Sequence, residues 1–163
     1  MKQNLVSMRL AVGVTLMLAY AAEAKASSVG VSAGPAWYDG QTGFAGHLDY
    51  RSSSSRVVFW QVDGGFSTQR KFSQRINTLV GAAVVGLSAR GGGWRASIGI
   101  GGGVNWDIPT AAVAVAIGMG ELGHDVGANS FVSAGYRYEV LYFEGFNTPK
   151  HRLFVTYRWS PRK

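Results

Sequence analysis

The most strictly alternating stretch of this sequence is its last one, His151-Arg-Leu-Phe-Val-Thr-Tyr-Arg-Trp159. Such alternation predicts a β-strand, because successive side chains of a strand point to opposite faces. Arginines occupy one face, whereas the other face carries two aliphatic and two aromatic residues, Leu153, Val155, Tyr157 and Trp159. A strand of this kind suits a wall between lipid and a polar interior. An amphipathic strand of a soluble β-sandwich is the alternative, and the rest of the chain distinguishes them.

The N-terminus has the order of segments that is typical of a secretory signal peptide. Residues 1–9 contain Lys2 and Arg9 and no acidic residue, and an apolar run follows over residues 10–22. Small residues at Ala22, Ala24 and Ala26 then offer two cleavage sites of the Ala-x-Ala kind. A membrane anchor is the alternative, but the run is shorter than the about 20 residues of a spanning helix. We therefore predict a signal peptide over 1–26 and one domain over 27–163.

Composition limits how that domain is stabilised. The chain of 163 residues has no cysteine, so a small exported domain must fold without disulfides. A closed membrane barrel does so because every strand is paired and no edge remains. The 23 glycines and the aromatic content of 12% suit that class. The net charge of +7 would fit nucleic-acid binding, but an exported protein whose arginines point into a barrel is a poor candidate, so we expect no nucleic-acid partner.

Period-two alternation recurs along the chain and predicts eight strands, an even number that lets the first strand pair with the last. The predicted strands cover residues 28–37, 42–51, 56–63, 76–90, 94–101, 111–119, 129–142 and 151–159. Most reach the about 9 to 11 residues that a tilted strand needs to cross a bilayer. The breaks between them include predicted loops or turns at 39–43, 52–55, 64–75, 91–93, 105–109, 121–128 and 143–150.

The predicted orientation of the strands follows from the larger apolar residues. In 94–101 these residues, such as Trp94 and Ile98, are expected to face outward. In 111–119 the same rule places Val113, Val115, Ile117 and Met119 outward and leaves only alanines and Gly118 inward. The strand at 76–90 is apolar on both faces, so its phase stays open.

The predicted fold is all-β, an eight-stranded antiparallel up-and-down transmembrane β-barrel. Its outward faces carry no charge on the well-phased strands, and six aromatic residues lie near strand ends, where such rings meet lipid headgroups: Tyr38, Tyr50, Trp60, Trp94, Tyr142 and Trp159. The interior of eight strands is only wide enough to be filled by side chains. We expect it to hold an ion-pair network, in which arginines bridge carboxylates. The network residues are His47, Asp49, Arg51, Asp63, Arg95, Arg137, Glu139 and Arg158, with Arg152 also facing inward.

The signal peptide, the eight strands and the final Leu-x-Val-x-Tyr-x-Trp pattern resemble the small outer-membrane β-barrels of Gram-negative bacteria, such as the OmpA transmembrane domain, OmpX, Ail and the opacity-type proteins. The resemblance implies a monomer in the bacterial outer membrane, with both termini periplasmic. It also implies that the barrel-assembly machinery reads Leu153, Val155, Tyr157 and Trp159. Residues 160–163 follow the aromatic residue where family members usually stop, and we interpret them as a short periplasmic tail.

This fold hosts several activities, so the function has to be argued from sites. The favoured hypothesis is a structural or surface role with outer-membrane lipids and lipopolysaccharide as partners, without a cofactor or a metal. Arg70, Lys71 and Arg75, together with Lys150, are candidates for contact with lipopolysaccharide phosphates, and ordinary solvated loop charge is the alternative. The predicted loops are short, which weakens an adhesin hypothesis.

The main alternative is an acyl hydrolase or acyltransferase that modifies lipid A. PagL-type deacylases resemble lipases with a His-x-Ser pair, but the histidines here occur as His47-Leu-Asp, His124-Asp-Val and His151-Arg-Leu. His47 and Asp49 share a face, as a base and its orienting acid would, but the sequence identifies no serine nucleophile beside them. A narrow pore is the second alternative, although a filled interior argues against an open channel.

Overall fold

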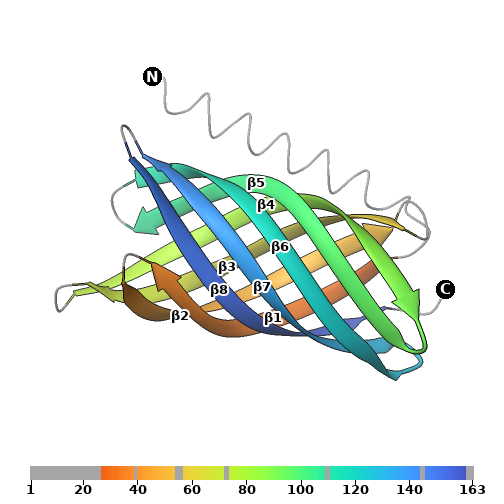
Figure 1. The fold of residues 1–163 in the computed structure, drawn as a ribbon. Helices are drawn as coiled ribbons and strands as arrows, with labels where there is room; N and C mark the ends of the chain where they lie inside the picture. Colours follow the sequence, from red (N-terminus) through yellow and green to blue (C-terminus); the bar gives the residue numbers. More distant parts are fainter. Residues whose placement is uncertain are drawn as a thin grey trace.

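The computed structural model describes residues 27–38, 40–53, 57–71, 74–108, 111–143 and 146–160. These residues form eight strands: β1 (Ser27–Tyr38), β2 (Gln41–Ser53), β3 (Val58–Lys71), β4 (Gln74–Gly91), β5 (Trp94–Ile108), β6 (Ala111–Gly127), β7 (Ser130–Phe143) and β8 (Phe146–Trp159). The strands close into one barrel in chain order, with every neighbouring pair antiparallel (Figure 1). The predicted all-β barrel is therefore confirmed.

The predicted signal peptide at 1–26 lies outside the described residues, so its cleavage site stays a prediction. The described residues contain no helix that is long and apolar enough to span a membrane.

The first and last strands meet side by side and close the barrel. Val29 pairs with Trp159, and Tyr38 pairs with Lys150. We call the end at which β1 begins and β8 ends the terminal end. The β1–β8 ladder is interrupted between Ala33 and Ala36, because Pro35 has no N–H to donate to its neighbour.

Several predicted loops are wrong, because the strands continue through them. β3 runs to Lys71 and β4 starts at Gln74, so most of 64–75 belongs to the two strands of a β-hairpin. The same correction holds for 105–109, 121–128 and 143–150, since β5 reaches Ile108, β6 reaches Gly127 and β8 starts at Phe146. Polar residues suggested loops in these segments, but four of them are buried in the barrel interior: Ser67, Asn105, Glu121 and Lys150.

The orientation predicted for β6 is also wrong. Val113, Val115, Ile117 and Met119 are buried in the barrel interior, which we call the lumen, whereas Ala112 and Ala114 are exposed. These large side chains fit in the lumen because the neighbouring β5 has glycines at Gly99, Gly101 and Gly103. A Cβ at any of these three positions would contact atoms of β4. On β4, whose orientation the sequence left open, Ala82 and Val84 also face the lumen. The resulting apolar group, called the lumen cluster, comprises Phe59, Ala82, Val84, Val113, Val115, Ile117, Met119 and Leu141.

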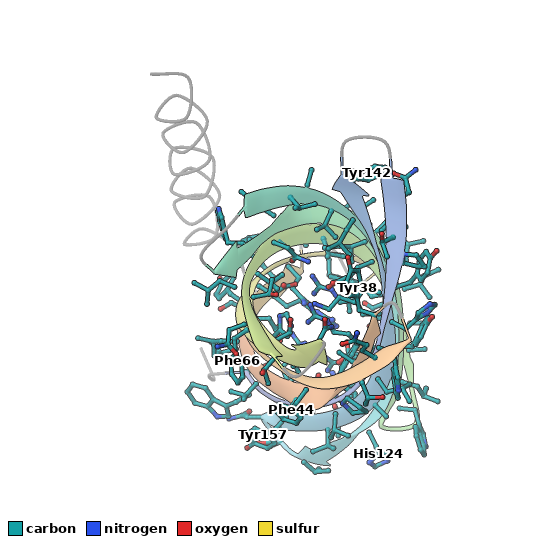
Figure 2. The ribbon with its side chains drawn as sticks, turned by 90° about the vertical axis from the view of Figure 1, so that its left-hand side faces the viewer. Tyr38, Phe44, Phe66, His124, Tyr142 and Tyr157 are labelled. Carbon is teal, nitrogen blue, oxygen red and sulfur yellow. The ribbon has the colours of Figure 1, made fainter. Side chains whose placement is uncertain are left out.

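The outer surface of the barrel is apolar. Ile98 and Ile100 are 66% and 70% exposed, and Leu48, Val31 and Val155 are similarly open. Aromatic residues are part of this surface, among them Tyr50 and Trp60, whose ring centroids lie 5.6 Å apart. Phe44, Phe66 and Tyr157 lie outside the wall in Figure 2. Tyr38 was predicted to join this outer set, but it lies inside and packs against the lumen cluster.

Candidate functional site

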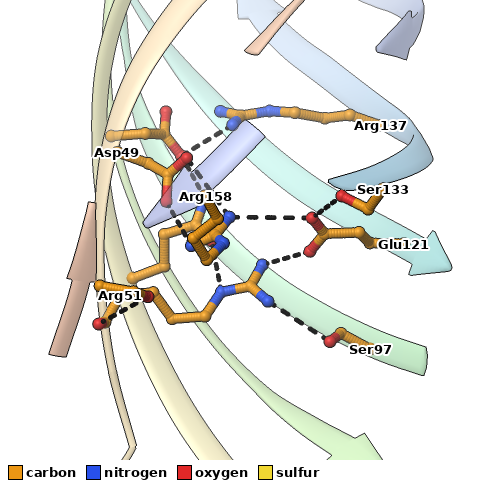
Figure 3. Close-up of polar contacts among 10 residues, drawn as sticks. Asp49, Arg51, Ser97, Glu121, Ser133, Arg137 and Arg158 are labelled. Carbon is orange, nitrogen blue, oxygen red and sulfur yellow. Dashed lines mark hydrogen bonds and ion pairs between the residues drawn. The ribbon is translucent and has the colours of Figure 1, made fainter. Parts of the chain in front are cut away.

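Charged residues meet inside the lumen, because alternation turns them inward on strands that surround the same space. The first ion cluster lies toward the terminal end (Figure 3). Arg158 holds Asp49 through two hydrogen bonds, with Nη1–Oδ1 at 2.6 Å and Nη2–Oδ2 at 3.4 Å. Arg51 Nη2 lies 2.6 Å from Glu121 Oε2, and its other nitrogens donate to Gln61 and Ser97. Each carboxylate of this cluster therefore has an arginine partner.

The second ion cluster lies next to the first along the lumen. Arg137 bridges two carboxylates, with Nη1 at 2.8 Å from Asp63 Oδ2 and Nε at 2.8 Å from Glu139 Oε1. Arg152 reaches the same Glu139 oxygen at 2.8 Å. His47 Nδ1 lies 3.5 Å from Asp63 Oδ1.

Burial makes these contacts structurally important. Asp49, Asp63, Glu121 and Glu139 are at most 5% exposed. A buried ion is expensive unless it is paired, and removal of one partner typically costs about 3–5 kcal/mol. The clusters therefore constrain which strands face one another in the lumen.

The structure brings seven of the eight predicted network residues into these two clusters: His47, Asp49, Arg51, Asp63, Arg137, Glu139 and Arg158. Arg95 lies elsewhere, at the rim of the terminal end, where Nη2 is 3.5 Å from Asp125 and its guanidinium covers the Phe131 ring. Glu121 was missed because its segment was interpreted as a turn. Continued alternation after Met119 is the signal that would have identified it.

Lys150 occupies a different environment from the one predicted. It is 3% exposed, and its Nζ donates a hydrogen bond to Ser67 at 2.8 Å. A role for Lys150 at surface phosphates is therefore wrong, since alternation along the longer β8 turns it inward. The side chains of Arg70, Lys71 and Arg75 lie outside the described part of the chain.

The histidines do not assemble a serine triad in the described residues. Asp49 was the predicted partner of His47, but Arg158 holds that carboxylate and Asp63 lies beside the imidazole instead. Ser32 is the register partner of His47, yet the ring leans toward Gly65 on β3, and the two side chains share no hydrogen bond.

The other two histidines lie on the outer wall. His124 is packed edge-on against Trp94, with ring centroids 5.0 Å apart. His151 forms a hydrogen bond through Nδ1 with the Tyr136 hydroxyl, and Tyr138 lies beside it. Among the described residues, no group of three His, Cys, Asp or Glu residues is placed to hold a metal.

Comparison by sequence finds no matching protein-family profile and no matching curated protein. Solved structures do match. Neisserial surface protein A aligns with a TM-score of 0.67 at 14% identity, over 82% of this chain and 95% of that one. The outer membrane enzyme PagL aligns with a TM-score of 0.56 at 16% identity, over 81% and 98%. The N-terminal β-barrel domain of Pseudomonas aeruginosa OprF aligns with a TM-score of 0.52 at 14% identity, over 81% and 97%. At these identities the likeness shows the fold, which is that of small outer-membrane barrels.

Proposed function

We propose that this chain spans the bacterial outer membrane as a filled, non-conducting barrel with a structural role, and that its outer wall contacts membrane lipid and lipopolysaccharide. One observation carries the proposal: the same strands expose large apolar residues outward and bury charged residues inward. A soluble barrel would have the opposite arrangement, because exposed apolar surface of this extent is unfavourable in water. The hydrocarbon core of a membrane is the environment in which such an apolar outer surface is favourable.

The filled lumen supports a structural role over transport. The two ion clusters and the lumen cluster share the lumen, and β3, β6 and β7 contribute side chains to both kinds of cluster. Both sets of side chains are almost fully buried. A steady aqueous path would require several of these ion pairs to break together, which is energetically expensive.

Cell fractionation and gel mobility test the membrane location. The expressed protein should sediment with outer membranes, require detergent for extraction, and change its gel mobility on heating. A protein that stays soluble and monomeric without detergent would contradict the proposal. Purified barrels in planar bilayers should show no steady conductance, and stable single-channel steps would favour the pore hypothesis.

Lipid A composition tests the enzyme alternative. Mass spectra of lipid A from cells with and without the chain should be identical if the role is structural. Loss or gain of one acyl chain would contradict a purely structural role. Variants His47→Ala, His124→Ala and His151→Ala would then show which histidine the chemistry needs.

A further inference from the structure

A small polar cluster lies on the mainly apolar outer wall of β7 and β8. Its members are His151, Tyr136 and Tyr138, and we call it the wall cluster. His151 Nδ1 and the Tyr136 hydroxyl lie 2.5 Å apart in a hydrogen bond, and the ring centroids of Tyr138 and His151 are 5.2 Å apart. Tyr136 and Tyr138 are 42% and 40% exposed, so both rings reach the surface that surrounds the barrel. Polar groups on a surface that faces hydrocarbon are unfavourable unless they find a hydrogen-bond partner.

The wall cluster has hydrogen-bond donors to offer a ligand. A neutral His151 and Tyr136 bring one such proton each, and their hydrogen bond uses one of the two in either tautomer of the ring. The other proton can be donated outward, and it is on Nε2 when the Tyr136 hydroxyl donates to Nδ1. The Tyr138 hydroxyl adds a second donor, which has no hydrogen-bond partner among the described residues. The cluster therefore suits a ligand group that accepts hydrogen bonds.

The position of the wall cluster along the barrel indicates its depth in a membrane. His151 precedes Trp159, an exposed aromatic residue at the terminal end, by eight residues on the same strand. A rise of about 3.3 Å per residue and a tilt of about 40° separate the two by about 20 Å along the barrel axis. The apolar band of such barrels is about 25 Å tall, with aromatic residues at both edges. Trp37 and Tyr138 pair with His151 from either side, so the wall cluster belongs to an aromatic row at the edge opposite the terminal end.

The chemistry of this row matches an acyl ester better than a phosphate. Among the described residues, the outward positions of β1, β7 and β8 include no lysine or arginine, the side chains that bind phosphate most strongly. A tyrosine hydroxyl and an imidazole N–H are uncharged donors, and the carbonyl oxygen of an ester is an uncharged acceptor. Acyl esters of membrane lipids lie where the hydrocarbon meets the headgroups, which is the depth of the aromatic row.

We propose that the wall cluster binds the acyl-ester carbonyl of a membrane lipid, with His151 Nε2 and the Tyr138 hydroxyl as donors. Tyr136 is a positioning residue, because its hydroxyl donates to Nδ1 and thereby keeps the ring proton on Nε2. The two donated hydrogen bonds hold the β7–β8 side of the barrel at a fixed depth. The inference rests on the proposed contact of the outer wall with lipid, and it names the lipid group that this contact recognises.

Ester-linked and ether-linked lipids with the same headgroup and chain length test the carbonyl specifically. The chain has three histidines, so labelling with ¹⁵N-histidine gives few ring signals. In nanodiscs of diacyl phosphatidylcholine, His151 should be protonated on Nε2, and its Nε2 resonance should shift when the diether lipid replaces the diacyl lipid. His47 in the lumen is the internal control and should not shift. Equal His151 signals in the two lipids would overturn the proposal, because a phosphate or a water would then be the partner.

Urea unfolding in vesicles of the same two lipids provides a second measurement. The change from ester to ether lipid should lower the folding equilibrium constant about tenfold more for the unaltered protein than for Tyr138→Phe/His151→Phe, which keeps the rings and removes both donors. Tyr157→Phe, on the outer wall at the terminal end, should behave like the unaltered protein. The same lipid effect in all three proteins would contradict the site. The proposed membrane location would still stand, since fractionation and heat-dependent gel mobility do not depend on the wall cluster.

Discussion

Arg158 on β8 and Asp49 on β2 form an ion pair across the intervening strand β1, with Nη1 2.6 Å from Oδ1. Gly30 of β1 pairs with both residues in register, so the three occupy one row around the wall. The ion pair thus joins the last strand to the second across the seam at which the barrel closes. It lies on the same seam as the ladder interruption at Pro35.

Removing the arginine should destabilise the barrel strongly. Arg158→Met leaves Asp49 buried without its partner, and we expect a loss of about 3–5 kcal/mol in the free energy of unfolding. Urea unfolding of the barrel refolded into lipid vesicles measures this loss. The double variant Asp49→Leu/Arg158→Met should recover most of the stability. Arg90→Gln, which breaks only an exposed ion pair with Asp125 at the rim, should change it by less than about 1 kcal/mol. Equal stability of Arg158→Met and the unaltered protein would show that the pair does not hold the seam.

Gly30 has no side chain, and the Asp49 carboxylate occupies the space that a side chain would fill. A Cβ at this position would lie 3.0 Å from Asp49 Cγ, so Gly30→Ala must displace the carboxylate from Arg158. We expect Gly30→Ala to cost about 1–3 kcal/mol, the usual range for overpacking. Gly118→Ala is the matched control, because a Cβ there meets nothing within 4 Å. The same unfolding assay compares the two, and equal effects would contradict the steric argument.

The inward orientation of Ile117 on β6 can be tested with a pair of variants on opposite faces of the strand. Ile117→Ala should cost about 2–5 kcal/mol, because it opens a cavity in the lumen cluster. Ala114→Leu adds apolar area to the outer wall and should be nearly neutral in lipid. Equilibrium unfolding in vesicles reports both values. A neutral Ile117→Ala combined with a damaging Ala114→Leu would indicate the reverse orientation.

The terminal aromatic residue of β8 should affect assembly more than stability. Leu153, Val155, Tyr157 and Trp159 all face outward, where an assembly factor can read them. Trp159→Ala should lower the membrane-inserted fraction in cells, whereas refolding of the purified protein in detergent should stay unchanged. Trp94→Ala is the control, since Trp94 is a similarly exposed tryptophan at the same end of the barrel. Equal insertion of the two variants would contradict an assembly signal in β8.

Alternation alone was sufficient to predict that these segments are β-strands and to identify most of the charged residues that face the lumen. It placed Asp49, Arg51, Asp63, Arg137, Glu139 and Arg158 on inward faces, because each of their strands has one charged and one apolar face. The run of three glycines at 91–93 indicated a turn, and Gly92 and Gly93 adopt φ of 58° and 81° there. That conformation suits a two-residue hairpin, and glycine reaches it without a steric penalty.

The sequence by itself determined that this chain forms two-faced strands sufficient in number to close a barrel, since period-two spacing is a local property of the backbone. Only the tertiary structure revealed the orientation of residues 111–119, a segment without a charged residue that fits either orientation, and showed that Glu121 continues the same strand. It also decided that Arg158 meets Asp49, that Glu121 joins them and that Tyr38 and Lys150 point inward. These contacts depend on the register between strands and on the shape of the closed lumen, and neither is a property of any single strand.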